Sequence, residues 1–261
     1  MPAACFEAVA PGRGRLTIHI RWHLTSMSSG HTSTFMSHKP HLPSRPAAII
    51  FDFDGVILDS AEIKAEAFAE IYSGYGRQWR EPILRYQRLH GGISRREKFD
   101  HFDKQIVGRA PTEERSALLS KRFSEIVFEK ILAAPFIPGA RELLDKATGR
   151  SRLFVVSGTP QRELVEVIRQ RALDHYFELV IGAPTKKREA FARILHMGLS
   201  RETVVAVGDS ITECSAACEL GIAFLGIRGG PSPTAFPEGI VTLPDLRDAS
   251  NLLGFGSLPP S

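Results

Sequence analysis

Residues 47–60 read AAIIFDFDGVILDS, and this stretch decides how the rest of the chain is interpreted. The run AAIIF is apolar at every position, which is typical of a strand covered on both faces. Asp52 and Asp54 follow it almost directly, and Gly55 then lets the backbone turn tightly. We therefore expect a buried strand that delivers two carboxylates to its carboxyl end.

Further apolar runs of the same kind recur along the chain, at 153–156, 178–181, 203–207 and 223–227. Amphipathic helical patterns alternate with them. This order predicts an α/β fold, a Rossmann-like doubly wound parallel sheet with helices on both faces. The predicted core comprises residues 47–62 and 134–250, and residues 251–261 form a C-terminal tail.

Residues 61–133 interrupt the alternation, because they contain no convincing strand. Their apolar residues recur at helical spacing in four stretches, at 61–76, 81–90, 94–107 and 112–132. We interpret residues 63–133 as an inserted, all-helical cap domain that follows the first strand and its loop.

Residues 1–46 differ in composition from the rest, being rich in Ser, Thr, Pro and His. Five Lys/Arg and one acid lie there, so this segment carries the whole net charge of +4 and the remainder is balanced. We expect a disordered extension, with Met27 or Met36 as possible true starts. A basic, acid-poor organelle transit peptide is the alternative.

The composition, 43% hydrophobic and 24% charged, is that of an ordinary soluble protein. No apolar run approaches the roughly 20 residues of a membrane-spanning helix. Three cysteines offer no disulfide framework, which favours a reducing, cytoplasmic location. Because the body is charge-balanced, we expect no nucleic-acid partner and no membrane partner. A monomer or a homodimer fits these observations equally.

Polar residues follow four of the predicted strands where each one ends. After the first come Asp52 and Asp54; after the others come Ser157, Gly158, Thr159, Lys186, Lys187, Asp209 and Glu213. The carboxyl ends of parallel strands meet at one edge of the sheet, and ligands bind there. We expect these side chains to form one site.

These residue types suit phosphoryl transfer. Clustered carboxylates repel one another unless a cation neutralises them, and oxygen ligands favour Mg²⁺. One carboxylate can act as the nucleophile, and a second can exchange protons with the leaving group and water. Ser157 and the N–H groups around Gly158 can hold phosphoryl oxygens, while a lysine neutralises their charge.

The motifs resemble those of haloacid dehalogenase (HAD)-superfamily phosphatases with a helical C1 cap, in particular the phosphoglycolate phosphatase and β-phosphoglucomutase-like members. DFDGVILDS, VVSGT, GAPTKKREAF and VGDSITECSAA resemble the four family motifs over residues 47–245. The resemblance implies that Asp52 is the nucleophile, Asp54 the general acid/base and Ser157 a phosphoryl ligand. It also implies that Asp209, Asp52 and the Asp54 carbonyl hold Mg²⁺.

Two positions need a choice or depart from the family pattern. We prefer Lys187 to Lys186 as the site lysine, because Phe191 and Ile194 follow it at the expected helical spacing. The fourth motif usually has a second aspartate, and here Glu213 stands in that place. Its longer side chain is a candidate metal ligand, directly or through water.

The predicted cap contains HGGISRREKF at 90–99, a Gly-Gly pair that opens a basic helix. Such a segment can approach the site and contact the leaving group of the substrate, with Arg95, Arg96 and Lys98 as candidates. Arg95 and Lys98, together with the site residues Gly55, Gly158 and Thr159, complete the expected substrate-binding set.

The sequence thus predicts a Mg²⁺-dependent phosphatase that hydrolyses a small phosphorylated metabolite through an aspartyl-phosphate. A phosphosugar mutase would use the same residues. A phosphonate hydrolase would need a Schiff-base lysine, for which Lys64 and Lys98 are candidates. A haloacid dehalogenase would have no need of Asp54. A non-catalytic binding or regulatory protein is the alternative from another class.

Overall fold

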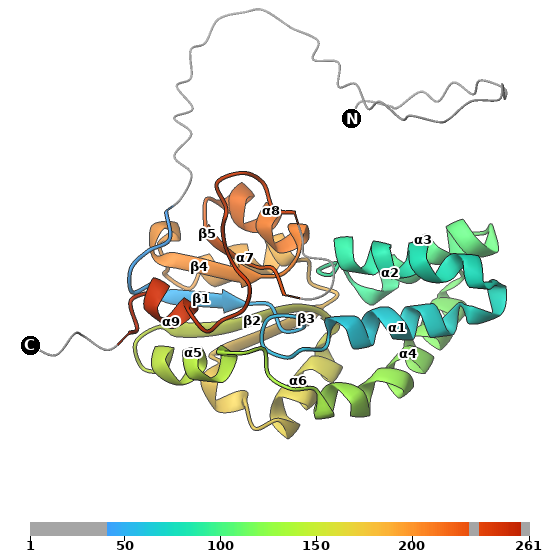
Figure 1. The fold of residues 1–261 in the computed structure, drawn as a ribbon, viewed down its shortest axis with the longest axis horizontal. Helices are drawn as coiled ribbons and strands as arrows, with labels where there is room; N and C mark the ends of the chain where they lie inside the picture. The colour runs from blue at the N-terminus through green and yellow to red at the C-terminus, as the bar shows by residue number, and fades with distance from the viewer. Residues whose placement is uncertain (1–40, 230–234, 257–261) are drawn as a thin grey trace, which may run out of the picture. The chain divides into compact units, whose positions relative to one another are not determined.

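A six-stranded parallel sheet lies at the centre of the computed structural model, which describes residues 41–229 and 235–256 (Figure 1). In chain order its strands are β1 (Ala48–Phe51), β2 (Arg152–Pro160), β3 (Leu179–Ala183), β4 (Val204–Gly208), β5 (Ala223–Ile227) and β6 (Val241–Leu243). Their spatial order is β3-β2-β1-β4-β5-β6. Ile50 of β1 pairs with Phe154 on one side and Ala206 on the other, so β1 is central. The doubly wound parallel sheet predicted from the sequence is confirmed, and β6 is an addition to it.

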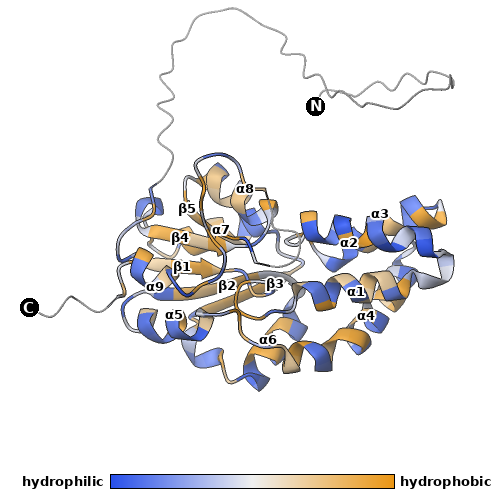
Figure 2. Ribbon diagram, viewed as in Figure 1, coloured by the Kyte–Doolittle hydropathy of each residue, from blue (hydrophilic) through white to orange (hydrophobic). Residues whose placement is uncertain are grey.

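Helices cover both faces of the sheet. One face carries α5 (Ala140–Ala147), α6 (Gln161–Gln170) and α9 (Ala249–Leu252), and the other carries α7 (Lys187–Leu195) and α8 (Ile211–Leu220). Strands β1 to β5 are apolar on both sides because residues of alternating direction enter two separate apolar clusters. Figure 2 shows this as hydrophobic strands between helices whose outer faces are hydrophilic.

The part of the chain between β1 and α5 is helical, as predicted, and resembles a cap. It contains α1 (Ala61–Ile71), α2 (Arg80–Leu89), α3 (Arg95–Phe102) and α4 (Glu113–Ala133). Phe68 is at the centre of an aromatic cluster, with the rings of Phe99, Phe102 and Phe123 between 4.5 and 5.5 Å away. This packing gives the cap region its own core. The limits 63 and 133 stay a prediction.

Shorter helical turns join the main elements. They are 3-10 helices at Ser73–Tyr75, Arg77–Trp79, Asp174–Tyr176 and Arg201–Thr203, and a π-helix at Asp103–Val107. No helix in the described ranges is long and apolar enough to cross a membrane.

The predicted chain ends need correction. The boundary at residue 251 is wrong, because it falls inside α9, and Leu253 and Phe255 beyond it are buried. On the other side, Pro46 is buried and the Arg45 N–H donates to the Leu253 carbonyl at 2.9 Å, so the segment just before β1 is part of the fold. The predicted extension up to residue 40 lies outside the described residues.

Candidate active site

Three neighbouring strands bring the predicted site residues together. Asp52 follows β1 directly, Ser157 and Thr159 belong to the end of β2, and Asp209 follows β4. The Asp52 N–H donates to the Val207 carbonyl at 2.9 Å, which ties the end of β1 to β4. The chain leaves β1 toward β2 and returns on its other side at β4, which makes this edge the switch point where ligands bind in such sheets.

Asp52, Asp209 and Glu213 form an acidic cluster. One carboxylate oxygen from each lies within 4.8 Å of the others. Burial raises the pKa of Asp52 to about 6, with the charges of Glu213 and Asp54 adding to the effect and Lys187 opposing it. Burial and the charge of Asp52 likewise raise the pKa of Asp209 well above its usual range. So concentrated a negative charge favours the binding of a cation, and an all-oxygen donor set suits a hard divalent one.

Glu213 shows most directly that a cation fits. Its Oε2 accepts hydrogen bonds from the N–H and the hydroxyl of Ser210 at the start of α8. Its Oε1 is buried and forms an ion pair with Lys187 Nζ at 3.1 Å, without a hydrogen bond of good geometry among the described residues. A metal ion bound by the cluster would be a further partner for this oxygen. The acidic cluster can therefore hold a metal ion.

Of the two candidate lysines, Lys187 is the one inside the site. Its Nζ donates to Asp52 Oδ1 at 2.6 Å and also to the Val156 carbonyl. Lys186 is exposed one residue earlier. The first turn of α7 starts at Lys187 and directs its side chain to the sheet edge, so its ammonium lies beside the predicted nucleophile.

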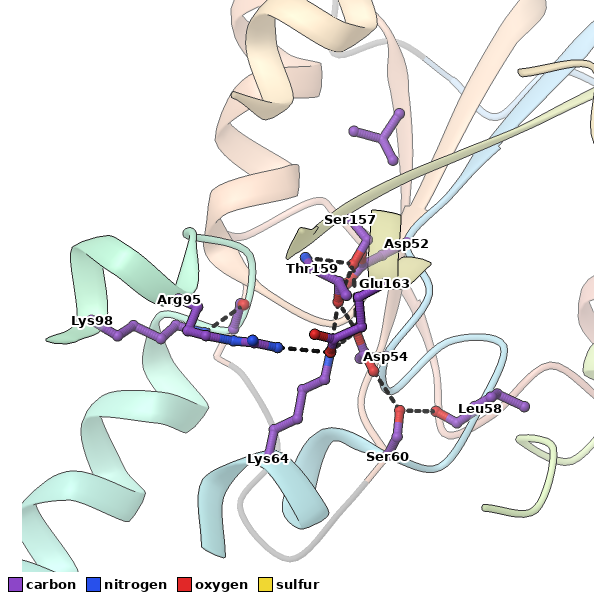
Figure 3. Close-up of polar contacts among 12 residues, drawn as sticks. Asp52, Asp54, Leu58, Ser60, Lys64, Arg95, Lys98, Ser157, Thr159 and Glu163 are labelled. Atoms are coloured by element: carbon purple, nitrogen blue, oxygen red, sulfur yellow. Dashed lines mark hydrogen bonds and ion pairs between the residues drawn. The ribbon is translucent and has the colours of Figure 1, made fainter. Parts of the chain in front are cut away.

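Asp54 lies at the centre of a second polar network (Figure 3). It accepts hydrogen bonds from Ser60 Oγ at 2.6 Å, Thr159 Oγ1 at 3.1 Å, Ser157 Oγ at 3.4 Å and Lys64 Nζ. Burial alone would raise the pKa of Asp54, but the Lys64 ion pair and these hydrogen bonds lower it below its usual value. Asp54 is therefore a carboxylate at neutral pH.

The sequence indicates Lys64 only as a candidate Schiff-base lysine, but the structure places it in the site, paired with Asp54. It lies on the first turn of α1, and its Nζ also donates to Thr159 Oγ1 at 2.6 Å. The available signal was its place one turn after Ser60, on the helix that leaves the site loop.

Gly55 and Gly92 allow close approaches that a side chain would block. Gly55 has a φ of +81°, and a Cβ on it would overlap Asp209 Oδ2. A Cβ on Gly92 would overlap Glu213 Oε1, so the Gly-Gly segment of the cap lies directly on the acidic cluster. Gly158 packs in turn against this segment, because a Cβ added at Gly158 would lie 2.8 Å from the Ile93 carbonyl oxygen. The expected approach of the Gly-Gly pair to the site is present.

A cavity of about 120 Å³ extends from the carboxylates into the cap region. Its walls include Asp52, Asp54, Gly55, Ser157, Gly158, Thr159, Phe68, Gln87, Arg88, Arg95, Lys98, Phe123 and Asp209. Lys98 is 4% exposed and donates to the Gly91 carbonyl at 2.9 Å, and burial lowers its pKa to about 7.

The two arginines of the cap segment are each paired with a glutamate. Arg95 donates to Glu163 Oε1 at 2.7 Å, as Figure 3 shows. Arg96 is exposed, pairs with Glu113 and is outside the cavity wall. Of the three basic candidates, Lys98 is thus the one whose charge is not already matched by a carboxylate among the described residues.

Comparison with known proteins places these features in a family. Residues 49–227 match the model of the family described as haloacid dehalogenase-like hydrolase. A "Phosphorylated carbohydrates phosphatase" of Thermotoga maritima is 29% identical over 194 residues, which cover 67% of this chain and 82% of that protein. A "Phosphoglycolate phosphatase" of Synechococcus elongatus is 28% identical over 193 residues, with coverages of 70% and 84%.

A solved structure shows the same fold. The crystal structure of CbbY from Rhodobacter sphaeroides in complex with phosphate has a TM-score of 0.63 to this chain, at 19% identity. The likeness covers 78% of this chain and 96% of that one. The sheet and the helical region are therefore shared between the two proteins.

Proposed function

The chain belongs to the haloacid dehalogenase-like hydrolase family, and on this premise we propose that it is a Mg²⁺-dependent phosphatase that hydrolyses a small phosphorylated metabolite. The observation that supports this most is the setting of Asp52. Asp52 directly follows the central strand β1. Lys187 Nζ donates to one of its oxygens, and the carboxylates of Asp209 and Glu213 lie beside it. The names of the two phosphatase relatives point the same way.

In the first half of the reaction, Asp52 attacks the phosphorus of the monoester and forms an aspartyl-phosphate. The bond from phosphorus to the leaving oxygen breaks, and that oxygen takes a proton. Because Asp54 is a carboxylate hydrogen-bonded to the Lys64 ammonium, the proton comes from this Asp54–Lys64 pair. Ser157 and Lys187 hold the oxygens of the transferring group.

In the second half, water attacks the phosphorus of the aspartyl-phosphate and gives its proton to Asp54. The proton returns to the Asp54–Lys64 pair, the bond from Asp52 to phosphorus breaks, and inorganic phosphate leaves. The lowered pKa of Asp54 keeps it ionised and able to accept this proton. Both halves together restore every side chain to its starting state.

Asp52, Asp209 and Glu213, with the Asp54 carbonyl, would hold the Mg²⁺ ion. When bound, the ion neutralises the clustered carboxylates and the charge on the phosphoryl oxygens. Lys187, which donates to Asp52 Oδ1 at 2.6 Å and lies 3.1 Å from Glu213 Oε1, contributes a further positive charge at the same cluster.

The experiment that tests this is release of inorganic phosphate from a panel of phosphate monoesters that includes an aryl phosphate. Each is assayed with Mg²⁺, with a chelator, and with Asp52→Asn in place of the wild type. Asp174→Asn is the matched control, because Asp174 is exposed and outside the site. Metal-dependent turnover that Asp52→Asn abolishes and Asp174→Asn retains supports the proposal. Turnover that survives Asp52→Asn overturns the nucleophile assignment.

Lys98 favours a second candidate, a phosphonate hydrolase. A buried lysine with a pKa near 7 is partly neutral at physiological pH and can attack a carbonyl. Borohydride trapping of a phosphonate that carries an aldehyde would attach it to Lys98 in that case, and no attachment would remove this candidate. Assays for isomer formation in the same panel separate a phosphosugar mutase from a hydrolase.

A further inference from the structure

Four basic side chains line the cavity, and their partners differ in kind. Three are each matched by a carboxylate: Lys64 by Asp54, Arg88 by Glu62 at 2.6 Å, and Arg95 by Glu163 at 2.7 Å. The fourth, Lys98, has no carboxylate within ion-pair distance in the described part of the chain. Its Nζ donates instead to the Gly91 carbonyl at 2.9 Å. Its Nζ also lies 5.7 Å from the centre of the Phe68 ring, a neutral partner. Two of its three N–H groups have no hydrogen-bond acceptor among the described residues, so a ligand oxygen can accept from them.

Gln87 supplies the second observation. It lies on α2, lines the same cavity and is 5% exposed. Its Oε1 is buried and accepts no hydrogen bond from any described residue. A buried amide oxygen without a donor is costly, so native structures rarely leave one unmatched. A donor supplied by a bound molecule would complete it.

We propose that Gln87 and Lys98 together recognise the leaving group of the substrate, Gln87 Oε1 by accepting from a hydroxyl and Lys98 by donating to an oxygen. This rests on the phosphatase function proposed above and names the substrate class, the phosphate monoester of a polyhydroxy compound. Gln87 is then a specificity-determining residue on α2, outside the cap segment that the sequence singled out.

The chemistry of the pair discriminates between leaving groups. A hydroxyl both donates and accepts, so adjacent hydroxyls match Gln87 and Lys98 at once. A carboxylate only accepts, so it matches Lys98 and leaves Gln87 Oε1 without a donor. A second phosphate brings more negative charge than one ammonium neutralises. The rings of Phe68 and Phe123 in the same wall provide apolar contact for a carbon skeleton.

The test compares substrates with and without hydroxyls, each measured with the wild type and with variants of Gln87. Two size-matched pairs differ in hydroxyls: glycerol 3-phosphate against propyl phosphate, and glucose 6-phosphate against cyclohexylmethyl phosphate. We expect the wild type to prefer the hydroxylated member of at least one pair by about tenfold in kcat/KM, the usual effect of one hydrogen bond. We expect this preference to disappear in Gln87→Leu. Gln87→Glu keeps a hydrogen-bond acceptor and should retain part of the preference.

Gln105→Leu is the matched control, because the same substitution falls there on an exposed cap residue outside the cavity. Both members of a pair are measured on one sample, so partial unfolding of a variant cancels in the ratio. Equal losses for both members in Gln87→Leu would overturn the proposal. So would a wild-type preference for phosphoglycolate that Gln87→Leu leaves unchanged.

The subsite can also be tested without turnover. Binding of glycerol 3-phosphate and glucose 6-phosphate to Asp52→Asn is measured by calorimetry, with and without Gln87→Leu. Binding that Gln87→Leu weakens about tenfold supports the subsite, whether or not the wild type releases phosphate. The absence of phosphate release from every substrate would refute the phosphatase function alone. Binding of both compounds unaffected by Gln87→Leu refutes the subsite alone.

Discussion

The ion pair between Arg95 and Glu163 joins α3 of the cap region to α6 of the core, and breaking it should destabilise the protein measurably. The side chains are 7% and 10% exposed, and Arg95 Nη2 lies 2.7 Å from Glu163 Oε1. Ser124 on α4 accepts from Arg95 Nη1 and donates to Glu163 Oε2, both at 2.7 Å. Glu163→Leu would leave a buried guanidinium that keeps only neutral acceptors, Ser124 and the Ser120 carbonyl.

The magnitude follows from distance and burial. Two unit charges about 4 Å apart attract by about 4 kcal/mol at an effective dielectric constant of about 20. Removal of one partner from a buried pair typically costs about 3–5 kcal/mol. Because Arg95 keeps its bonds to α4, we expect Glu163→Leu to lower the free energy of unfolding by about 3 kcal/mol. Arg95→Met with Glu163→Leu removes both charges and should cost less than the two single changes added together.

Urea unfolding of the wild type, both single variants and the double variant gives the coupling free energy, which we expect to be about 2 kcal/mol or more. Arg96 and Glu113 provide the control, since this pair also begins on α3 but its side chains are 59% and 69% exposed. An exposed pair of this kind should show a coupling of about 0–1 kcal/mol. If the Arg95–Glu163 coupling is no larger than that of Arg96–Glu113, the reasoning from burial is refuted.

Three further predictions concern the site. Burial lowers the pKa of Lys98 to about 7, so its ammonium is lost as the pH rises through that value. The kcat/KM for hydroxylated substrates should therefore fall above a pH of about 7, and a pH profile of Lys98→Met should lack this limb. Gly55→Ala should lower kcat about a hundredfold, because a Cβ there displaces Asp209; unchanged turnover would show that the loop adjusts freely. Lys187→Met should lower kcat about 10²–10³-fold at saturating Mg²⁺, since it removes the cation beside Asp52. A loss below about tenfold would assign charge neutralisation to other groups.

Much of the core was predictable because its signals are local. A strand covered on both faces must be apolar at every position, so β1 to β5 are visible as continuous runs. β6 is not visible in the sequence, because it has three residues and its first, Val241, is exposed. The predicted C-terminal boundary is wrong for a related reason. Leu253 and Phe255 lie in no periodic pattern, and only packing against the sheet's helices buries them.

The site divides in the same way. Asp52, Ser157 and Asp209 could be found because each follows an apolar run, and parallel strands necessarily bring their carboxyl ends to one edge. Lys64, Gln87 and Glu163 could not be found like this. The partner of Lys64 is 10 residues away and that of Glu163 is 68 residues away, while Gln87 Oε1 has no partner among the described residues.

The sequence by itself determined the parallel sheet, the helical insertion and the carboxylates at the strand ends, because strand periodicity and chain order suffice for these. Only the tertiary structure decided which charges are available. Arg95 and Lys98 are three residues apart on one helix and look equivalent in the sequence. A carboxylate from the core neutralises Arg95, while Lys98 faces the cavity without one among the described residues. That difference depends on how the cap region packs against α6, which no local pattern encodes.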